Sequence, residues 1–167
     1  MDVLVSDTSV IIDLERAQII EHVFTLPYRF IVPDILYEQE LKAYGGERLI
    51  ARGLQVQSLT GEQVQEAQRL RTLERRLSIH DSYALSLAKA MAAILLAGDA
   101  ALRRLAENEG VRCHGVLWVF DQFESREILA RGALHDGLTR LAAHPRCRLP
   151  RDQITPRLTR LGAKPEE

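Results

Sequence analysis

The sequence predicts a three-layer α/β/α fold with a central parallel sheet of four to five strands, followed by a C-terminal helical extension. Short apolar runs such as Val3–Val5 and Ile94–Ala97 alternate with segments that have the apolar spacing of amphipathic helices. This alternation is typical of parallel α/β folds, whose strands are buried on both faces. The chain has 167 residues, of which 46% are hydrophobic and 27% charged, so one globular domain with an appendage is expected.

The first half of the chain predicts three strands and the helices between them. The expected strands are residues 3–6, 30–32 and 54–59. Val10 and Leu14 have the spacing of one helix face behind the first strand, and residues 19–24 indicate a second, short helix. Pro33 suits the first turn of a helix, which we expect to end at the glycine pair that begins with Gly45.

The second half predicts two further strands. Two capping-box patterns, Thr60–Gln63 and Ser78–Asp81, indicate where two helices start. The remaining strands are expected at residues 94–97 and 111–114, and the helix between them should end at Gly110.

The composition and apolar spacing of the sequence change after the helix that begins near Val116. Two short helices are expected around Gly132, and prolines and arginines follow them. We therefore expect a catalytic domain at residues 1–124 and a helical extension at residues 125–167.

Composition limits the classes of protein to which the chain can belong. The formal net charge is −1, and two cysteines, Cys113 and Cys147, are too few for a disulfide framework. The N-terminal residues lack the pattern of a signal peptide, and the longest apolar stretch, residues 90–98, is about half of a membrane span. A cytoplasmic protein without membrane partners is expected.

Four acidic residues are the candidate functional residues. They are Asp7, Glu38, Asp81 and Asp99. Asp7 and Asp99 come at the ends of two expected strands, and ligands of parallel sheets bind beyond the carboxyl ends of strands. Carboxylates gathered there repel one another unless a cation holds them. Oxygen-only ligands suit Mg²⁺ or Mn²⁺, which can activate water for attack on a phosphodiester.

Each of these residues also has a structural explanation. Asp7 and Asp99 could be helix N-caps, and Asp81 could be the acidic member of a capping box. Glu38 and Glu40 could both be solvated helix residues. The coincidence of several acidic residues at one edge of the expected sheet favours the functional interpretation.

At these positions the sequence resembles PIN-domain proteins, and it is similar to the VapC-type ribonuclease toxins of prokaryotic toxin–antitoxin pairs. The segments that carry the resemblance are residues 3–14, 31–38, 77–85 and 94–99. The resemblance implies a metal-dependent endoribonuclease that hydrolyses RNA. It also implies a cognate antitoxin that blocks the site, and a homodimer.

The resemblance implies an acidic pocket for Mg²⁺ or Mn²⁺ made by Asp7, Glu38, Asp81 and Asp99. Thr8 or Ser9 would orient Asp7, or a water on the metal, through a hydroxyl group. Gln39 and Glu40 stand between Glu38 and the next apolar residue, so Glu40 could share or replace the role of Glu38.

Two other functional classes compete with this interpretation. A degenerate PIN domain would act as a non-catalytic RNA-binding or protein-binding regulatory module, and a pocket that fails to retain metal would support it. A phosphatase of the haloacid-dehalogenase type would need an Asp two residues after its nucleophilic Asp, but Ser9 occupies that position. The sequence therefore favours the nuclease.

Overall fold

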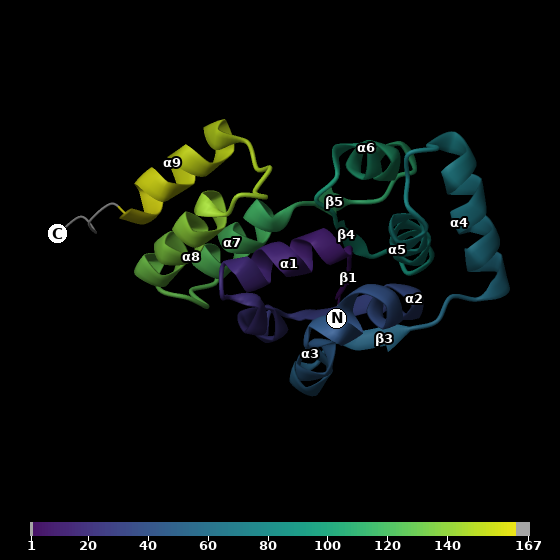
Figure 1. Cartoon of the computed structure of the whole chain (residues 1–167), viewed down its shortest axis with the longest axis horizontal. Coiled ribbons are helices and arrows are strands. Elements are labelled where there is room, and N and C mark those ends of the chain that lie inside the picture. The colour runs from purple at the N-terminus through teal and green to yellow at the C-terminus, as the bar shows by residue number, and fades with distance from the viewer. Residues whose placement is uncertain (1, 163–167) are drawn as a thin grey trace.

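The computed structural model describes residues 2–162, and its strands form one parallel sheet in the order β3-β2-β1-β4-β5 (Figure 1). The strands are β1 (Asp2–Ser6), β2 (Tyr28–Pro33), β3 (Gln55–Gln57), β4 (Ile94–Leu96) and β5 (Cys113–His114). The α-helices are α1 (Thr8–Arg16), α2 (Asp34–Leu36), α3 (Gly46–Arg52), α4 (Gly61–Leu73), α5 (Ile79–Ala90), α6 (Ala100–Asn108), α7 (Val116–Ser125), α8 (Arg131–Ala143) and α9 (Arg151–Gly162). The other helical elements are two 3₁₀ segments, Ile20–Thr25 and Lys42–Tyr44, and a π-helix, Tyr37–Leu41.

Helices cover both faces of the sheet, so the predicted three-layer α/β fold is confirmed. Leu4 of β1 packs in a core with α1, α7, α8 and α9, whereas the next residue, Val5, packs in a second core with α4, α5 and α6. Successive side chains of a strand point to opposite faces, which explains why the apolar runs of these strands are continuous.

The order of the strands creates a switch point beside β1. The chain moves outward from β1 to β2 and β3, and then crosses back to β4, which pairs with β1 on its other side. Ser6 at the end of β1 is in register with Leu96 at the end of β4. Such a point is where ligands bind in open α/β sheets, and the residues that follow both strands emerge there.

The helix expected after β2 is divided, and the structure shows an additional helix. Pro33 ends β2, and α2 passes into the π-helix and then the second 3₁₀ segment. The helical run ends at the glycine pair, as expected, and α3 begins there: Gly45, with a φ of 83°, is the C-cap of the second 3₁₀ segment, and a Cβ on Gly46 would lie 2.7 Å from Cε2 of Tyr37. The glycines thus permit a left-handed turn and a close approach, and the sequence did not predict α3.

The C-terminal helices also differ from the expectation. Gly132 lies in the first turn of α8 and does not separate two short helices, and Pro156 lies inside α9. The α9 helix persists because Ile154 and Leu161 are buried in the core that contains Leu4. The boundary between residues 1–124 and 125–167 stays a prediction, and the last five residues of the proposed extension lie outside the described residues.

Within residues 2–162, no helix is both long enough and apolar enough to cross a membrane.

Candidate functional site

Asp7 is the most rigidly held of the candidate residues. It caps α1 directly after β1, and its Oδ1 accepts a hydrogen bond from the N–H of Val10 at 2.9 Å. Its Oδ2 accepts hydrogen bonds from the Ser9 hydroxyl at 2.8 Å and from the N–H of Gly98 at 2.9 Å. The residue is only 2% exposed. Burial raises the pKa of Asp7 although these hydrogen bonds lower it.

Gly98 connects the end of β4 to the start of α1. A Cβ at this position would collide with the Ser9 hydroxyl and displace it from its hydrogen bond to Asp7. The backbone N–H of Asp7 also donates to the carbonyl of Leu96 at 2.9 Å. These contacts fix the segment that leads into α6 against Asp7.

Asp99 caps α6, as the structural explanation of this residue predicted. Its Oδ2 accepts a hydrogen bond from the N–H of Leu102 at 2.9 Å, and the residue is exposed. Capping does not exclude a second role, because a carboxylate has several lone pairs and this bond uses one of them.

Asp81 lies in the first turn of α5, and its backbone is fixed by Ser78, whose hydroxyl accepts the N–H of Asp81 at 3.0 Å. Burial raises the pKa of Asp81 to about 6; the charges of Asp7, Asp99 and Glu40 add to this shift, and the Ser78 hydroxyl opposes it. Asp7 and Asp99, which come from two other segments, therefore lie close enough to Asp81 for their charges to disfavour its ionisation.

The two glutamates face different partners. Oε2 of Glu38 lies 3.3 Å from Nζ of Lys42, and the Glu38 side chain is 58% exposed. Oε1 of Glu40 lies 2.7 Å from Nδ1 of His80, the residue before Asp81. Residues two apart in a regular helix are about 200° apart around its axis, so one helix face cannot present both glutamates. The structure brings Glu40 toward the aspartates and turns Glu38 toward Lys42.

The π-helix explains why the sequence did not separate these glutamates. Its wider turn over Tyr37–Leu41 adds a residue between β2 and the following segment, and such turns are frequent at functional sites. His80 also lies 2.8 Å from Oε1 of Gln39 through its Nε2, so its ring holds the π-helix against α5. The sequence indicates only a packing or capping role for His80, because periodicity gives no signal for this contact.

Two further observations concern cation binding. The hydroxyl of Thr8 is buried and has no hydrogen-bond partner within the described residues, although it directly follows Asp7. Among residues 2–162, no three His, Cys, Asp or Glu side chains are placed to hold a metal ion together. Ser9, and not Thr8, makes the hydrogen bond to Asp7.

The arginines of α4 and of the loop that follows it differ in their contacts: one is held in salt bridges between helices and another is largely exposed. Arg69 bonds to Glu66 at 2.7 Å and Glu109 at 2.9 Å, so it holds α4 to α6. Arg76 is 75% exposed beyond its contact with Glu74.

Comparison with known proteins adds a family to this geometry. The sequence matches the model of a family described as a PIN domain over residues 3–163. Among solved structures, it is similar to a PilT N-terminus domain protein from the hyperthermophilic archaeon Sulfolobus solfataricus. The two share 18% identity over 80% of this chain and 94% of that chain, with a TM-score of 0.45. No curated protein matches the sequence.

Proposed function

The chain belongs to the PIN-domain family, whose members are typically nucleases, and we propose that it is a metal-dependent endoribonuclease. The observation that supports this most is the position of Asp81, half-buried beside Asp7 and Asp99. In the described part of the chain, no arginine or lysine forms a salt bridge with any of the three aspartates. A fold that gathers repelling carboxylates without pairing them leaves room for a cation from solution.

The chemistry of the donor atoms suits Mg²⁺ or Mn²⁺. All candidate ligands are oxygen atoms, the pKa values of Asp7 and Asp81 are raised because burial and uncompensated charge disfavour ionisation, and the buried Thr8 hydroxyl lacks a partner within the described residues. Asp7, Asp81 and Asp99 would hold the ion after their side chains rotate toward it. A bound divalent ion supplies Lewis-acid activation of water and of the phosphoryl oxygen.

The residues proposed for this site have different roles. Asp7 is preset by three hydrogen bonds and provides the fixed ligand. Asp81 and Asp99 have fewer restraints and adjust to the cation and to the RNA. We propose that Glu40, held by His80, completes the set in place of Glu38, whose carboxylate is paired with Lys42.

Cleavage of RNA tests this function directly. Purified protein, freed of any bound partner, is incubated with single-stranded RNA in Mn²⁺ and in EDTA, with Asp81→Asn as the inactive control. We expect cleavage only by the wild type in Mn²⁺. Equal cleavage in EDTA would overturn the metal requirement, and equal cleavage by Asp81→Asn would overturn the site.

A non-catalytic regulatory module is the second candidate function. It is favoured by the finding that no three described side chains are placed to hold a metal ion. Such a module would bind RNA or a protein and would cleave no RNA in any divalent cation. The same assay therefore separates the two functions, provided that binding is measured beside cleavage.

We further propose that the protein acts as the toxin of a toxin–antitoxin pair, as a homodimer. The support is the similarity of four sequence segments, residues 3–14, 31–38, 77–85 and 94–99, to VapC-type toxins. Induced expression should arrest growth, and Asp81→Asn should not. A small neighbouring reading frame whose product relieves the arrest would identify the antitoxin, and light scattering would give the oligomeric state.

A further inference from the structure

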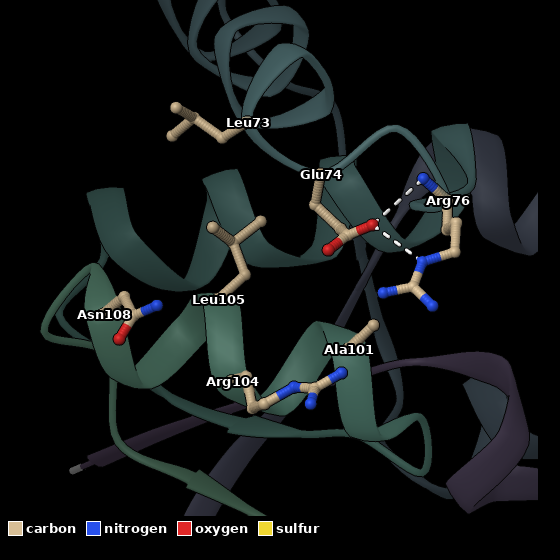
Figure 2. Close-up of a pocket in the computed structure, with 7 residues that line it drawn as sticks. All are labelled: Leu73, Glu74, Arg76, Ala101, Arg104, Leu105 and Asn108. Carbon is tan, nitrogen blue, oxygen red and sulfur yellow. Dashed lines mark hydrogen bonds and ion pairs between the residues drawn. The ribbon is translucent and has the colours of Figure 1, made fainter.

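A groove of about 300 Å³ lies between α6 and the C-terminal end of α4 (Figure 2). It is lined by Leu73, Glu74, Arg76, Ala101, Arg104, Leu105 and Asn108. Ala101 lies two residues after Asp99, so one end of the groove lies beside the acidic site. None of the lining residues has a role in the site described above.

The charged end of the groove is the end nearer the acidic site. In Figure 2, the guanidinium groups of Arg76 and Arg104 both lie toward Ala101, and Asn108 lies at the other end. Side chains of a helix tilt toward its N-terminus, which carries Arg104 in this direction. The hydrogen bond to Glu74 raises the pKa of Arg76, and the charge of Asp99 adds to this shift, so Arg76 lies near Asp99 of the acidic site as well as near Glu74.

Glu74 neutralises only part of this positive charge. Its Oε1 lies 3.1 Å from Nε of Arg76, and Arg104 also acts on it electrostatically. Two cations and one anion leave the lining with a net charge of +1. The lining of the groove is therefore positive. An RNA strand that places one phosphate at the acidic site would place the neighbouring phosphate near these arginines.

The other end of the groove is apolar and has one amide. Leu73 is 56% exposed although it is a large apolar side chain, and it lines the groove with Leu105 and Asn108. A base could lie over Leu73 while the Asn108 amide offers both donors and an acceptor to its edge. A groove with phosphate-binding cations at one end and an apolar surface at the other suits a nucleotide of single-stranded RNA.

We propose that this groove binds the RNA nucleotide next to the cleaved phosphodiester, with Arg76 and Arg104 contacting phosphate oxygens; this rests on the proposed ribonuclease function. Arginine binds phosphate with two parallel hydrogen bonds, and phosphate contacts dominate the affinity and salt dependence of RNA binding.

Binding of a short fluorescein-labelled single-stranded RNA, measured by anisotropy in EDTA over a range of salt concentrations, tests the proposal. Arg76→Gln with Arg104→Gln should lower affinity on the order of tenfold or more at low salt, the equivalent of one or more charged hydrogen bonds. The slope of log affinity against log salt should become shallower by about 0.7 for each phosphate that the variant no longer binds.

The matched control is Arg52→Gln, which removes one positive charge from α3. The Arg52 side chain is 56% exposed and pairs with Glu21 at 3.3 Å, away from the groove. Melting temperatures of all variants verify folding. Wild-type affinity and slope in the double arginine variant, or an equal loss per charge in Arg52→Gln, would overturn the proposal. If the double arginine variant kept wild-type affinity and slope, an acidic protein segment would be the better candidate ligand of the groove.

Cleavage by the same variants in Mn²⁺ separates this proposal from the proposed function. A wild type that binds RNA through Arg76 and Arg104 but cleaves none would support the groove and overturn hydrolysis. A wild type that cleaves RNA while the double variant binds it with unchanged affinity would overturn the groove and leave hydrolysis standing.

Discussion

Two groups of carboxylates in this fold have opposite surroundings. Asp121 and Glu124 of α7 are paired with arginines of α9: Nη2 of Arg157 lies 2.8 Å from Asp121, and Nη2 of Arg160 lies 2.9 Å from Glu124. The aspartates at the carboxyl end of the sheet have no such salt bridge in the described part of the chain, and burial raises the pKa of Asp7 and Asp81. The first group joins two helices, whereas the second leaves negative charge that no salt bridge within residues 2–162 neutralises.

A third group of carboxylates, Glu66 and Glu109, lies on the other side of the sheet and is also paired with cations. Hydrogen bonds from Arg69 and then Lys89 lower the pKa of Glu66 to about 2, and the same two cations lower the pKa of Glu109. This sequence therefore pairs carboxylates with cations where they join helices. The unpaired aspartates stand out against that background, and substitutions in the two kinds of group can test whether the difference is functional.

The largest expected effect is on cleavage by Asp81→Asn and Asp99→Asn. Removing a metal ligand should lower the rate by more than the roughly 10-fold to 100-fold typical of residues that only support ligands. Asn caps a helix nearly as well as Asp, so Asp99→Asn should keep the fold. Single-turnover rates in Mn²⁺ and melting curves of both variants measure this. Wild-type rates in both variants would contradict the metal site.

Asp7→Asn differs from these two variants because of its hydrogen bonds. Oδ2 of Asp7 accepts from both Ser9 and Gly98, and an amide NH₂ group at that place cannot accept either bond. We therefore expect loss of cleavage together with some loss of stability. The other two aspartates are the cleaner tests of function.

The next effect is the stabilisation of the wild type by Mn²⁺. Binding to the folded state alone adds about 2.7 kcal/mol at a hundredfold excess over Kd, and thermal melts would show this as a rise of several degrees. Asp81→Asn should lose the rise, whereas Arg157→Gln, which breaks a paired carboxylate on α7, should keep it. A wild-type midpoint unmoved by millimolar Mn²⁺ would contradict the idea that the unpaired aspartates bind a cation.

The fold and the positions of Asp7 and Asp99 could be predicted from the sequence because both depend on strands. A buried strand is a continuous apolar run, and a residue directly after it must emerge at the carboxyl edge of a parallel sheet. Asp7 follows β1 in this way, and Asp99 lies three residues beyond Leu96 of β4. Their positions need no knowledge of side-chain packing.

Other features depend on tertiary contacts and could not be predicted as well. They are the choice between Glu38 and Glu40, the helix α3 and the C-terminal helices. Which glutamate faces the site depends on the π-helix and on His80, from a segment about forty residues later in the chain. The glycine pair ends the preceding helical run, as such pairs usually do, but α3 begins directly at Gly46 because the Gly46 backbone is packed against Tyr37 and Leu41. Pro156 stays helical because Ile154 and Leu161, on either side of it in α9, are buried.

Glu40→Gln and Glu38→Gln compare two carboxylates of one helical segment, one that contacts His80 beside the aspartates and one that pairs with Lys42. Glu40→Gln should weaken Mn²⁺ binding by about tenfold, the low end of the effect of groups around a metal. Glu38→Gln should leave it unchanged, because its carboxylate pairs with Lys42 at 3.3 Å. Calorimetric titration with Mn²⁺ measures both. The reverse order of effects would restore Glu38 as the fourth ligand.

The pH dependence of stability should also distinguish the unpaired aspartates. The pKa of Asp81 is raised from 3.8 to about 6, so the folded protein binds this proton more tightly than the unfolded chain does. The resulting stability is fully present below pH 3.8 and is lost as pH rises through about 6. Denaturation in EDTA should therefore show Asp81→Asn gaining stability relative to the wild type between these pH values. A constant difference across that range would contradict the raised pKa.

The smallest effect is expected from breaking a paired carboxylate. Arg157 binds Asp121 through two nitrogens, at 3.0 and 2.8 Å, and the two side chains are 23% and 36% exposed. A partly exposed ion pair contributes up to about 1 kcal/mol, so Asp121→Asn should lower the free energy of unfolding by that amount or less. Asp81→Asn in EDTA at neutral pH should raise it, because the asparagine relieves repulsion with Asp7 and Asp99. Chemical denaturation of both variants under the same conditions measures the two signs. If both substitutions lowered stability, the acidic site would be held together by its own carboxylates, and the contrast between it and α7 would be wrong.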